Sequence, residues 1–194
     1  FIPTWEVNAI ATSLGRGYVQ VGNPTKTLES CHVGNFRVTS NYNRTTPPAG
    51  YSINVNTGIY AVLMGPNTTS FGLSDCTVSD LWMKGVGGEA AIGRTGGNNA
   101  EATAKTRCDV ARVRVRDSFT TGVNDVSGGV SGDVTDCRFR QLGKVGIESA
   151  AQNSRFTANL MEECDASGIS TESNAAQGGV VEIDNNRIRY CGQN

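Results

Sequence analysis

The sequence predicts an all-β fold, a right-handed single-stranded parallel β-helix (a solenoid) of roughly six or more coils. Three observations predict it: a composition rich in turn residues, a recurring Cys- or Asn-led motif, and apolar residues that alternate with polar ones around that motif. The 194 residues include 24 Gly and 5 Pro, and only 18% are charged, which favours short strands and turns over long helices.

A six-residue motif recurs along most of the chain. In the early copies a Cys is followed by apolar residues two and five positions later, and in the last two copies Asn takes the first place and Cys the last. The copies start at Cys31, Cys76, Cys108, Cys137, Asn159 and Asn186. The intervals between them are 45, 32, 29, 22 and 27 residues; the last four fall within the period expected of solenoid proteins, and the longest contains an insertion.

The alternation around each copy indicates strands, as where Val113 and Val115 alternate with Arg114 and Arg116. A unit of two or three short strands cannot hold a core alone, so the units are expected to stack, with equivalent residues in ladders about 4.8 Å apart. We expect the leading Cys and Asn residues to form one such ladder, in which Asn amides bond to one another and to turn backbone.

The domain organisation follows from where the motif fits. Residues 1–30 fit it poorly and are expected to form an N-terminal cap or partial coil, followed by the β-helix over residues 31–194. Turn-rich stretches predict inserted loops at about 39–57 and 85–107. Because the sequence starts without Met and ends without a terminating element, we expect a fragment of a longer chain.

The stretch Asn186-Arg187-Ile188-Arg189-Tyr190-Cys191 resembles the pectin-lyase-like superfamily, in which Asn-x-Ile-x-x-Cys or Leu recurs once per coil, followed by Gly-Ile. The resemblance covers residues 31–194 and implies the parallel β-helix. It does not choose the chemistry, because the superfamily includes lyases, hydrolases, epimerases and non-catalytic phage fibres. The resemblance to phage tailspikes also implies a homotrimer in the full-length protein.

The six Cys residues bear on the compartment. Stacked Cys side chains would have Cβ atoms about 4.8 Å apart, beyond the usual span of a disulfide, so we expect buried, reduced cysteines. This favours a phage tail protein, made in the bacterial cytoplasm and carried on the virion, over a secreted enzyme as the alternative. With no Cys-x-x-Cys and a single His, no metal site or cofactor is expected.

Charge and hydropathy limit the partners. The formal net charge is −1, so we expect no broad basic field and no nucleic-acid partner. No apolar run approaches the roughly 20 residues that span a bilayer, so membrane insertion is not expected. The expected partner is a bacterial surface polysaccharide.

Three carboxylates are the candidate catalytic residues. Glu148 and Glu172 follow Ile147 and Ile169 on adjacent coils, on one outward face that the resemblance places beside the substrate groove. Their Cα atoms are expected about 8 Å apart, within the carboxyl separation of inverting glycosidases. Asp125, near a turn, is either a third acid or an ordinary solvated turn residue.

The candidate substrate-binding residues are outward-facing or lie in turns: Trp82, Arg114, Arg116, Asp117, Lys144 and Asp165. Trp82, between Leu81 and Met83, is expected to stack on a sugar ring, with packing as the alternative. Glu162 lies level with Arg140 and Arg189, so we expect a charge ladder there and no catalytic role.

Three functional hypotheses follow. The first is a tailspike-like protein that binds a bacterial polysaccharide and cleaves it as a glycosidase, by acid–base hydrolysis. The second is a non-catalytic fibre or adhesin segment, which binds without forming products. The third is a secreted lyase or epimerase of the pectate-lyase kind, distinguished by Ca²⁺ dependence and, for a lyase, an unsaturated product.

Overall fold

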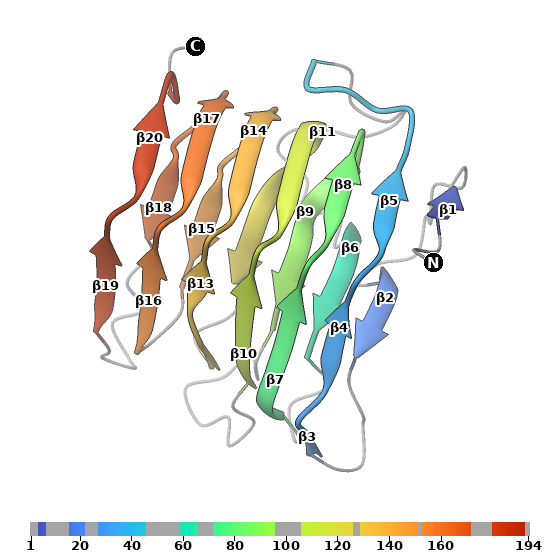
Figure 1. Ribbon diagram of the computed structural model, residues 1–194, viewed down its shortest axis with the longest axis vertical. Helices are drawn as coiled ribbons and strands as arrows, with labels where there is room; N and C mark the ends of the chain where they lie inside the picture. The colour runs from blue at the N-terminus through green and yellow to red at the C-terminus, as the bar shows by residue number, and fades with distance from the viewer. Residues whose placement is uncertain are drawn as a thin grey trace.

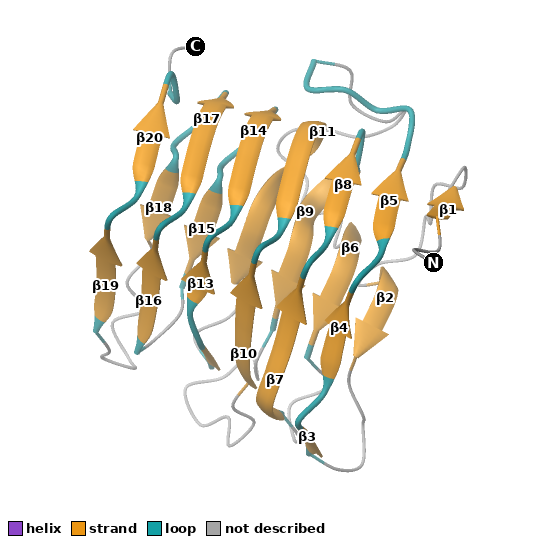
Figure 2. Ribbon diagram, viewed as in Figure 1, coloured by secondary structure: helices purple, strands orange, loops and turns teal. Residues whose placement is uncertain are grey.

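The protein is all-β: the described part of the chain contains strands and turns and no helix (Figure 1, Figure 2). The computed structural model describes residues 4–6, 16–21, 27–45, 59–65, 72–95, 106–125, 129–150, 153–171 and 180–192. Its strands are β1 (Thr4–Glu6), β2 (Arg16–Val21), β3 (Leu28–Glu29), β4 (His32–Gly34), β5 (Arg37–Thr39), β6 (Ile59–Met64), β7 (Leu73–Ser79), β8 (Trp82–Lys84), β9 (Gly87–Arg94), β10 (Thr106–Ala111), β11 (Arg114–Asp125), β12 (Val130–Ser131), β13 (Val134–Thr135), β14 (Arg138–Leu142), β15 (Ile147–Ser149), β16 (Ser154–Thr157), β17 (Leu160–Cys164), β18 (Ile169–Thr171), β19 (Val181–Asp184) and β20 (Arg187–Arg189).

All described strand pairs are parallel, and they define three sheets. Sheet 1 contains β3, β4, β7, β10, β12, β13, β16 and β19. Sheet 2 contains β1, β5, β8, the first part of β11, β14, β17 and β20. Sheet 3 contains β2, β6, β9, the second part of β11, β15 and β18.

The chain visits the sheets in a fixed order, and each visit to all three is called a pass. One pass runs through β7, β8 and β9, the next through β10 and the two parts of β11, and the next through β13, β14 and β15. Each strand of a pass pairs with its equivalents in the passes before and after it, so the passes stack along one axis (Figure 1). This stacking is consistent with the predicted solenoid.

Tight corners recur between the sheets, and residues with positive φ form them. Between sheets 1 and 2 these residues are Asn35, Asp80, Arg112, Asp136, Ala158 and Asn185. Between sheets 2 and 3 they are Gly85, Asp117, Gln141, Glu163 and Tyr190. Asn, Asp and Gly adopt this left-handed conformation at the lowest cost, which explains why polar residues separate the short apolar strands.

The core lies between the sheets and consists of inward-pointing rows. Val110 of sheet 1, Val115 of sheet 2 and Val123 of sheet 3 are buried in the same pass, and each stacks on an apolar equivalent in the next pass. At the C-terminal end of the stack, Ile183 and Ile188 occupy the same inward rows but are 52% and 50% exposed, because no described strand stacks on β19 or β20.

The predicted Asn ladder is confirmed. The Asn159 side chain is buried, its Oδ1 accepts from the backbone N–H of Cys137 at 2.9 Å, and its Nδ2 donates to the carbonyl of Val134 at 2.8 Å. In the next pass Asn186 repeats the pattern, accepting from the Asn159 N–H at 3.0 Å and donating to the Phe156 carbonyl at 2.7 Å. These amides satisfy backbone groups at the corner between sheets 1 and 2.

The predicted membership of the ladder is wrong. Cys31, Cys76 and Cys108 share one row on sheet 1, since Cys108 pairs with Cys76 and His32 pairs with Thr77. Arg138 pairs with Arg114, so Cys137 stacks level with Val113 in a different row, the row that continues into Asn159. Both rows take small side chains that point inward, so residue type alone does not distinguish them.

The loop expected at about 85–107 is a strand for much of its length. Residues 87–94 form β9, and every residue of it is buried. Gly85 is the corner, and the Gly-rich residues after it pair with β6 and β11. Residues 96–105, and residues 46–57 of the other expected loop, lie outside the described residues. Residues 1–30 contribute a strand to each sheet, namely β1, β2 and β3.

Candidate functional site

Glu148 lies in sheet 3 with its side chain on the outward side. Its neighbours along the strand, Ile147 and Ser149, are buried, whereas Glu148 is half-buried between Asn124 of β11 and Ser170 of β18. The Asn124 Nδ2 donates to Glu148 Oε2 at 3.4 Å. Glu172 lies outside the described residues, so the predicted separation of the two carboxylates stays a prediction.

Asp125 is neither a solvated turn residue nor an outward acid. Asp125 is the last residue of β11, and its side chain points inward. Two nitrogens of Arg94 in β9 donate to its carboxylate, Nε to Oδ1 at 2.6 Å and Nη2 to Oδ2 at 2.9 Å. Both side chains are fully buried, and Ser149 donates a further hydrogen bond to Asp125. A carboxylate held in this way has no route to a substrate on the surface.

Arg94 also joins two sheets. Its Nη1 donates to the carbonyls of Cys108 and Gly132, at 2.6 and 3.1 Å, so the guanidinium connects sheet 3 with sheet 1. Burial disfavours the charge on Arg94, but the neighbouring Asp125 outweighs burial and raises the pKa of the guanidinium. The pair therefore belongs to the core.

Asp117, Lys144 and Asp165 lie at or just beyond the corner between sheets 2 and 3. Asp117 forms the corner itself, with φ 47°. Asp165 accepts from Arg44 Nε at 2.6 Å, and Arg44 Nη1 lies 3.4 Å from Glu163. Arg44 belongs to the segment after β5, which thus reaches across the corner to the pass that contains β17. Asp165 is therefore part of an ion-paired contact.

Trp82, Arg114 and Arg116 lie together on the outward face of sheet 2, as predicted for outward positions. Arg114 pairs in register with Trp82. The guanidinium of Arg37 lies 4.5 Å from the centre of the Trp82 ring, and that of Arg116 lies 5.3 Å from it. The indole is thus held by cation–π contacts with Arg side chains on both neighbouring strands.

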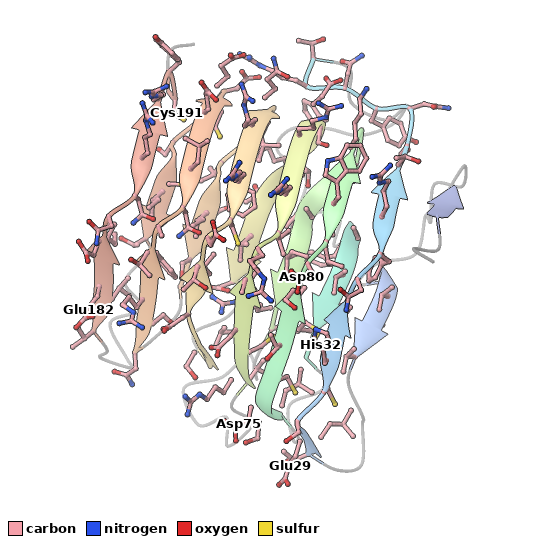
Figure 3. The ribbon with its side chains drawn as sticks, in the orientation of Figure 1. Glu29, His32, Asp75, Asp80, Glu182 and Cys191 are labelled. Atoms are coloured by element: carbon pink, nitrogen blue, oxygen red, sulfur yellow. The ribbon has the colours of Figure 1, made fainter. Side chains whose placement is uncertain are left out.

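These residues belong to a larger array that is here named the cationic face. Its first row, across sheet 2, is Arg37, Trp82, Arg114, Arg138, Leu160 and Arg187. Its second row is Thr39, Lys84, Arg116, Arg140, Glu162 and Arg189. All seven arginines in the two rows are exposed. The side chains facing the viewer on these strands carry many nitrogen atoms (Figure 3).

The net charge predicted no broad basic field, and for this face that prediction is wrong. Eight of the 17 Lys and Arg residues lie in the two rows, with one acid, Glu162. The predicted ladder at Glu162 is present, since Glu162 lies between Arg140 and Arg189 in register and bonds Arg140 at 2.7 Å. The sequence signal was available: Arg-x-Arg occurs at Arg114, Arg138 and Arg187 in otherwise matching strands.

A His–Ser–Asp contact occurs beside the corner between sheets 1 and 2, where Figure 3 labels His32 and Asp80. Ser79 Oγ donates to Asp80 Oδ2 at 2.8 Å, and His32 Nε2 lies 3.0 Å from the same Oγ. Because the hydroxyl hydrogen is directed to Asp80, His32 acts as donor and does not activate Ser79. Hydrogen bonds from Arg112 and Ser79 lower the pKa of Asp80 to about 2.

Among the described residues, no group of three or more His, Cys, Asp or Glu side chains is arranged to hold a metal ion. That part of the chain also contains no helix long and apolar enough to cross a membrane. Comparison with known proteins gave no match to this chain among family models, curated proteins or solved structures.

Proposed function

We propose that the chain is a segment of a right-handed parallel β-helix of the pectin-lyase-like kind, with roughly six or more coils, and that it binds a bacterial surface polysaccharide. A role in a phage tailspike-like protein on the virion belongs to the same proposal. The observation that carries it is the regular repetition of outward side chains along the stacked strands. Such rows suit a ligand that is itself a repeating chain, because each repeat meets an equivalent position.

Cleavage by glycoside hydrolysis is a second proposal, and Glu148 favours it. Glu148 is a half-buried carboxylate on an outward strand position, beside an Asn side chain. An outward position gives this carboxyl group access to a glycan on the surface of sheet 3, which a general acid requires. Glu172 is the proposed partner. Asp125 is left out of this proposal because Arg94 occupies its carboxylate.

The test is incubation of the chain with a panel of capsular, O-antigen and uronate polysaccharides, following binding, new reducing ends and near-ultraviolet absorbance together. Binding with new reducing ends supports a hydrolase, and absorbance from an unsaturated product indicates a lyase. Binding without any product leaves a non-catalytic fibre or adhesin segment. A chain that binds no glycan in the panel would contradict the proposed function.

The residue assignment is tested with Glu148→Gln and Glu172→Gln. Each is expected to lower turnover by at least a hundredfold with little change in binding, because an amide is nearly isosteric with a carboxyl group but transfers no proton. Glu182→Gln, on the exposed face of sheet 1, is the matched control and is expected to retain full activity. Full turnover in both Glu148→Gln and Glu172→Gln would exclude this pair as the catalytic acids.

A further inference from the structure

The cationic face presents an uncompensated charge array. Arg114 and Arg138 lie opposite each other on adjacent strands, as do Arg116 and Arg140. Like charges directly opposite destabilise a sheet unless counter-charges neutralise them. Glu162 is the one acid in the two rows, and it bonds Arg140. Within the described residues, no side-chain hydrogen bond or ion pair is seen for Arg114, Arg138, Arg187 or Arg189.

The other arginines of the described surface form ion pairs with acids. On sheet 1, Arg155 bonds Asp133 at 3.2 Å, and at the corner Arg112 bonds Asp80 at 2.7 Å through each of two nitrogens. Among the described residues, arginines elsewhere are paired with acids, whereas Arg114, Arg138, Arg187 and Arg189 of sheet 2 have no acidic partner. An external anion is the missing partner that this contrast indicates.

The geometry of the array limits the shape of that anion. Neighbouring strands lie about 4.8 Å apart and the two rows about 6.6 Å apart, so the cations form a narrow band along the stack. The backbone beneath is hydrogen-bonded to strands on both sides, which fixes the band. Guanidinium groups bind carboxylates and sulfates through two parallel hydrogen bonds. A linear chain with an anionic group on each short repeat matches this band.

We infer that the cationic face binds a linear anionic polysaccharide, which lies along the stacked strands with its carboxylate or sulfate groups against the two arginine rows. The inference rests on the proposed function in that the ligand is a glycan, and it adds the charge of the glycan and the face that binds it. Trp82 marks one place on the band where an apolar sugar face contacts an indole edge. The strand spacing is close to the length of one sugar residue in an extended chain.

Two features favour a glycan over a nucleic acid. Single-stranded nucleic acids bind through bases stacked on several aromatic side chains, whereas the cationic face has one aromatic residue, Trp82, whose ring already contacts Arg37 and Arg116. A duplex is wider than the band, and it would extend past the corner onto sheet 1, whose outward positions include Asp109 and Asp133. A single narrow chain avoids both problems.

The experiment measures binding of the whole chain to alginate oligosaccharides, which carry a carboxylate on each sugar, and to the same oligosaccharides with the carboxylates reduced to alcohols. The reduced oligosaccharides are expected to bind at least tenfold more weakly. Arg114→Gln combined with Arg138→Gln is expected to weaken alginate binding at least tenfold. Arg107→Gln combined with Arg155→Gln removes the same charge from sheet 1 and is expected to change it less than twofold.

A second pair of substitutions keeps the charge and removes the forked geometry. Arg114→Lys combined with Arg138→Lys is expected to give an intermediate loss, because an ammonium cannot form two parallel hydrogen bonds to one carboxylate. Thermal unfolding of each variant verifies the fold. Arg114 and Arg138 are exposed, and their replacement by Gln relieves like-charge repulsion, so the Gln variant is not expected to lower the midpoint.

Four results would overturn the inference. One is an equal loss of alginate binding in the sheet 1 variant, which would indicate attraction without a site. Another is that the chain binds oligo-dT more tightly than alginate of equal charge, which would indicate a nucleic-acid partner. The third is dissociation of a dimer or trimer by the Arg114 and Arg138 substitutions, seen by sedimentation, which would indicate a second copy as the occupant. If those substitutions leave glycan binding intact, this inference fails while the proposed function stands.

Discussion

Removal of Arg94 should destabilise the protein severely. In Arg94→Met the side chain keeps a similar length, but the carboxylate of Asp125 stays in the core without its counter-ion. Breaking a fully buried ion pair from one side costs about 3–5 kcal/mol. The carbonyls of Cys108 and Gly132 also lose a donor, which places the expected loss at the upper end of that range.

The assay is urea unfolding followed by circular dichroism, with a thermal scan beside it. For a chain of this size, 1 kcal/mol corresponds to about 2–4 °C, so a loss near the upper end, about 5 kcal/mol, lowers the midpoint by roughly 10–20 °C. The double variant Arg94→Met with Asp125→Leu removes both charges and should recover much of the loss. An Arg94→Met protein as stable as the parent would refute the assignment of this pair to the core.

Three further predictions concern stability, titration and reactivity. Asn159→Ala should cost about 1–3 kcal/mol in urea unfolding, because it leaves buried backbone groups without partners; a neutral result would contradict the ladder. Asp80, with a folded pKa of about 2 against an ordinary value of 3.8, adds stability that is present above the ordinary pKa and lost as pH falls towards 2. Arg112→Gln should raise that pKa in an NMR titration, and an unchanged value would exclude Arg112 as the cause. Burial raises the pKa of the Cys108 thiol to about 12, so a thiol reagent should modify half-buried Cys31 in the folded protein and leave Cys108 intact; rapid labelling of Cys108 would contradict its burial.

The sequence predicted the strands correctly because alternation depends on local physics, and the repeat of the motif predicted that they stack in parallel. Val113 and Val115 are buried and Arg114 and Arg116 exposed, as a period of two requires. The register was harder to predict. Cys108 and Cys137 look alike in the motif, yet they lie in different rows, because a small inward site in either row accepts a Cys. The φ values that define the corners are not visible in residue type alone, since Arg112 and Ala158 adopt them too.

The error at Asp125 has the same origin. A carboxylate near Gly-rich sequence is typical of a solvated turn, and nothing local to it announces a counter-ion. Arg94 is adjacent only because β9 and β11 pair in register, so that Arg94 and Asp125 face the core at the same level. The burial of Asp125 therefore depends on the register of β9 and β11. The six-residue motif does not extend to these strands, so it carried no information on that register.

Net charge failed as a guide to partners for a reason specific to stacked folds. In a globular domain the charges of one short segment are spread over a rounded surface, so the total is informative. In this chain an Arg-x-Arg strand that recurs in successive passes becomes two continuous rows, whatever acids lie on the other sheets. The formal charge of −1 is therefore the sum of faces with opposite character. A ligand that contacts one sheet experiences the charge of that sheet, and for sheet 2 that charge is strongly positive.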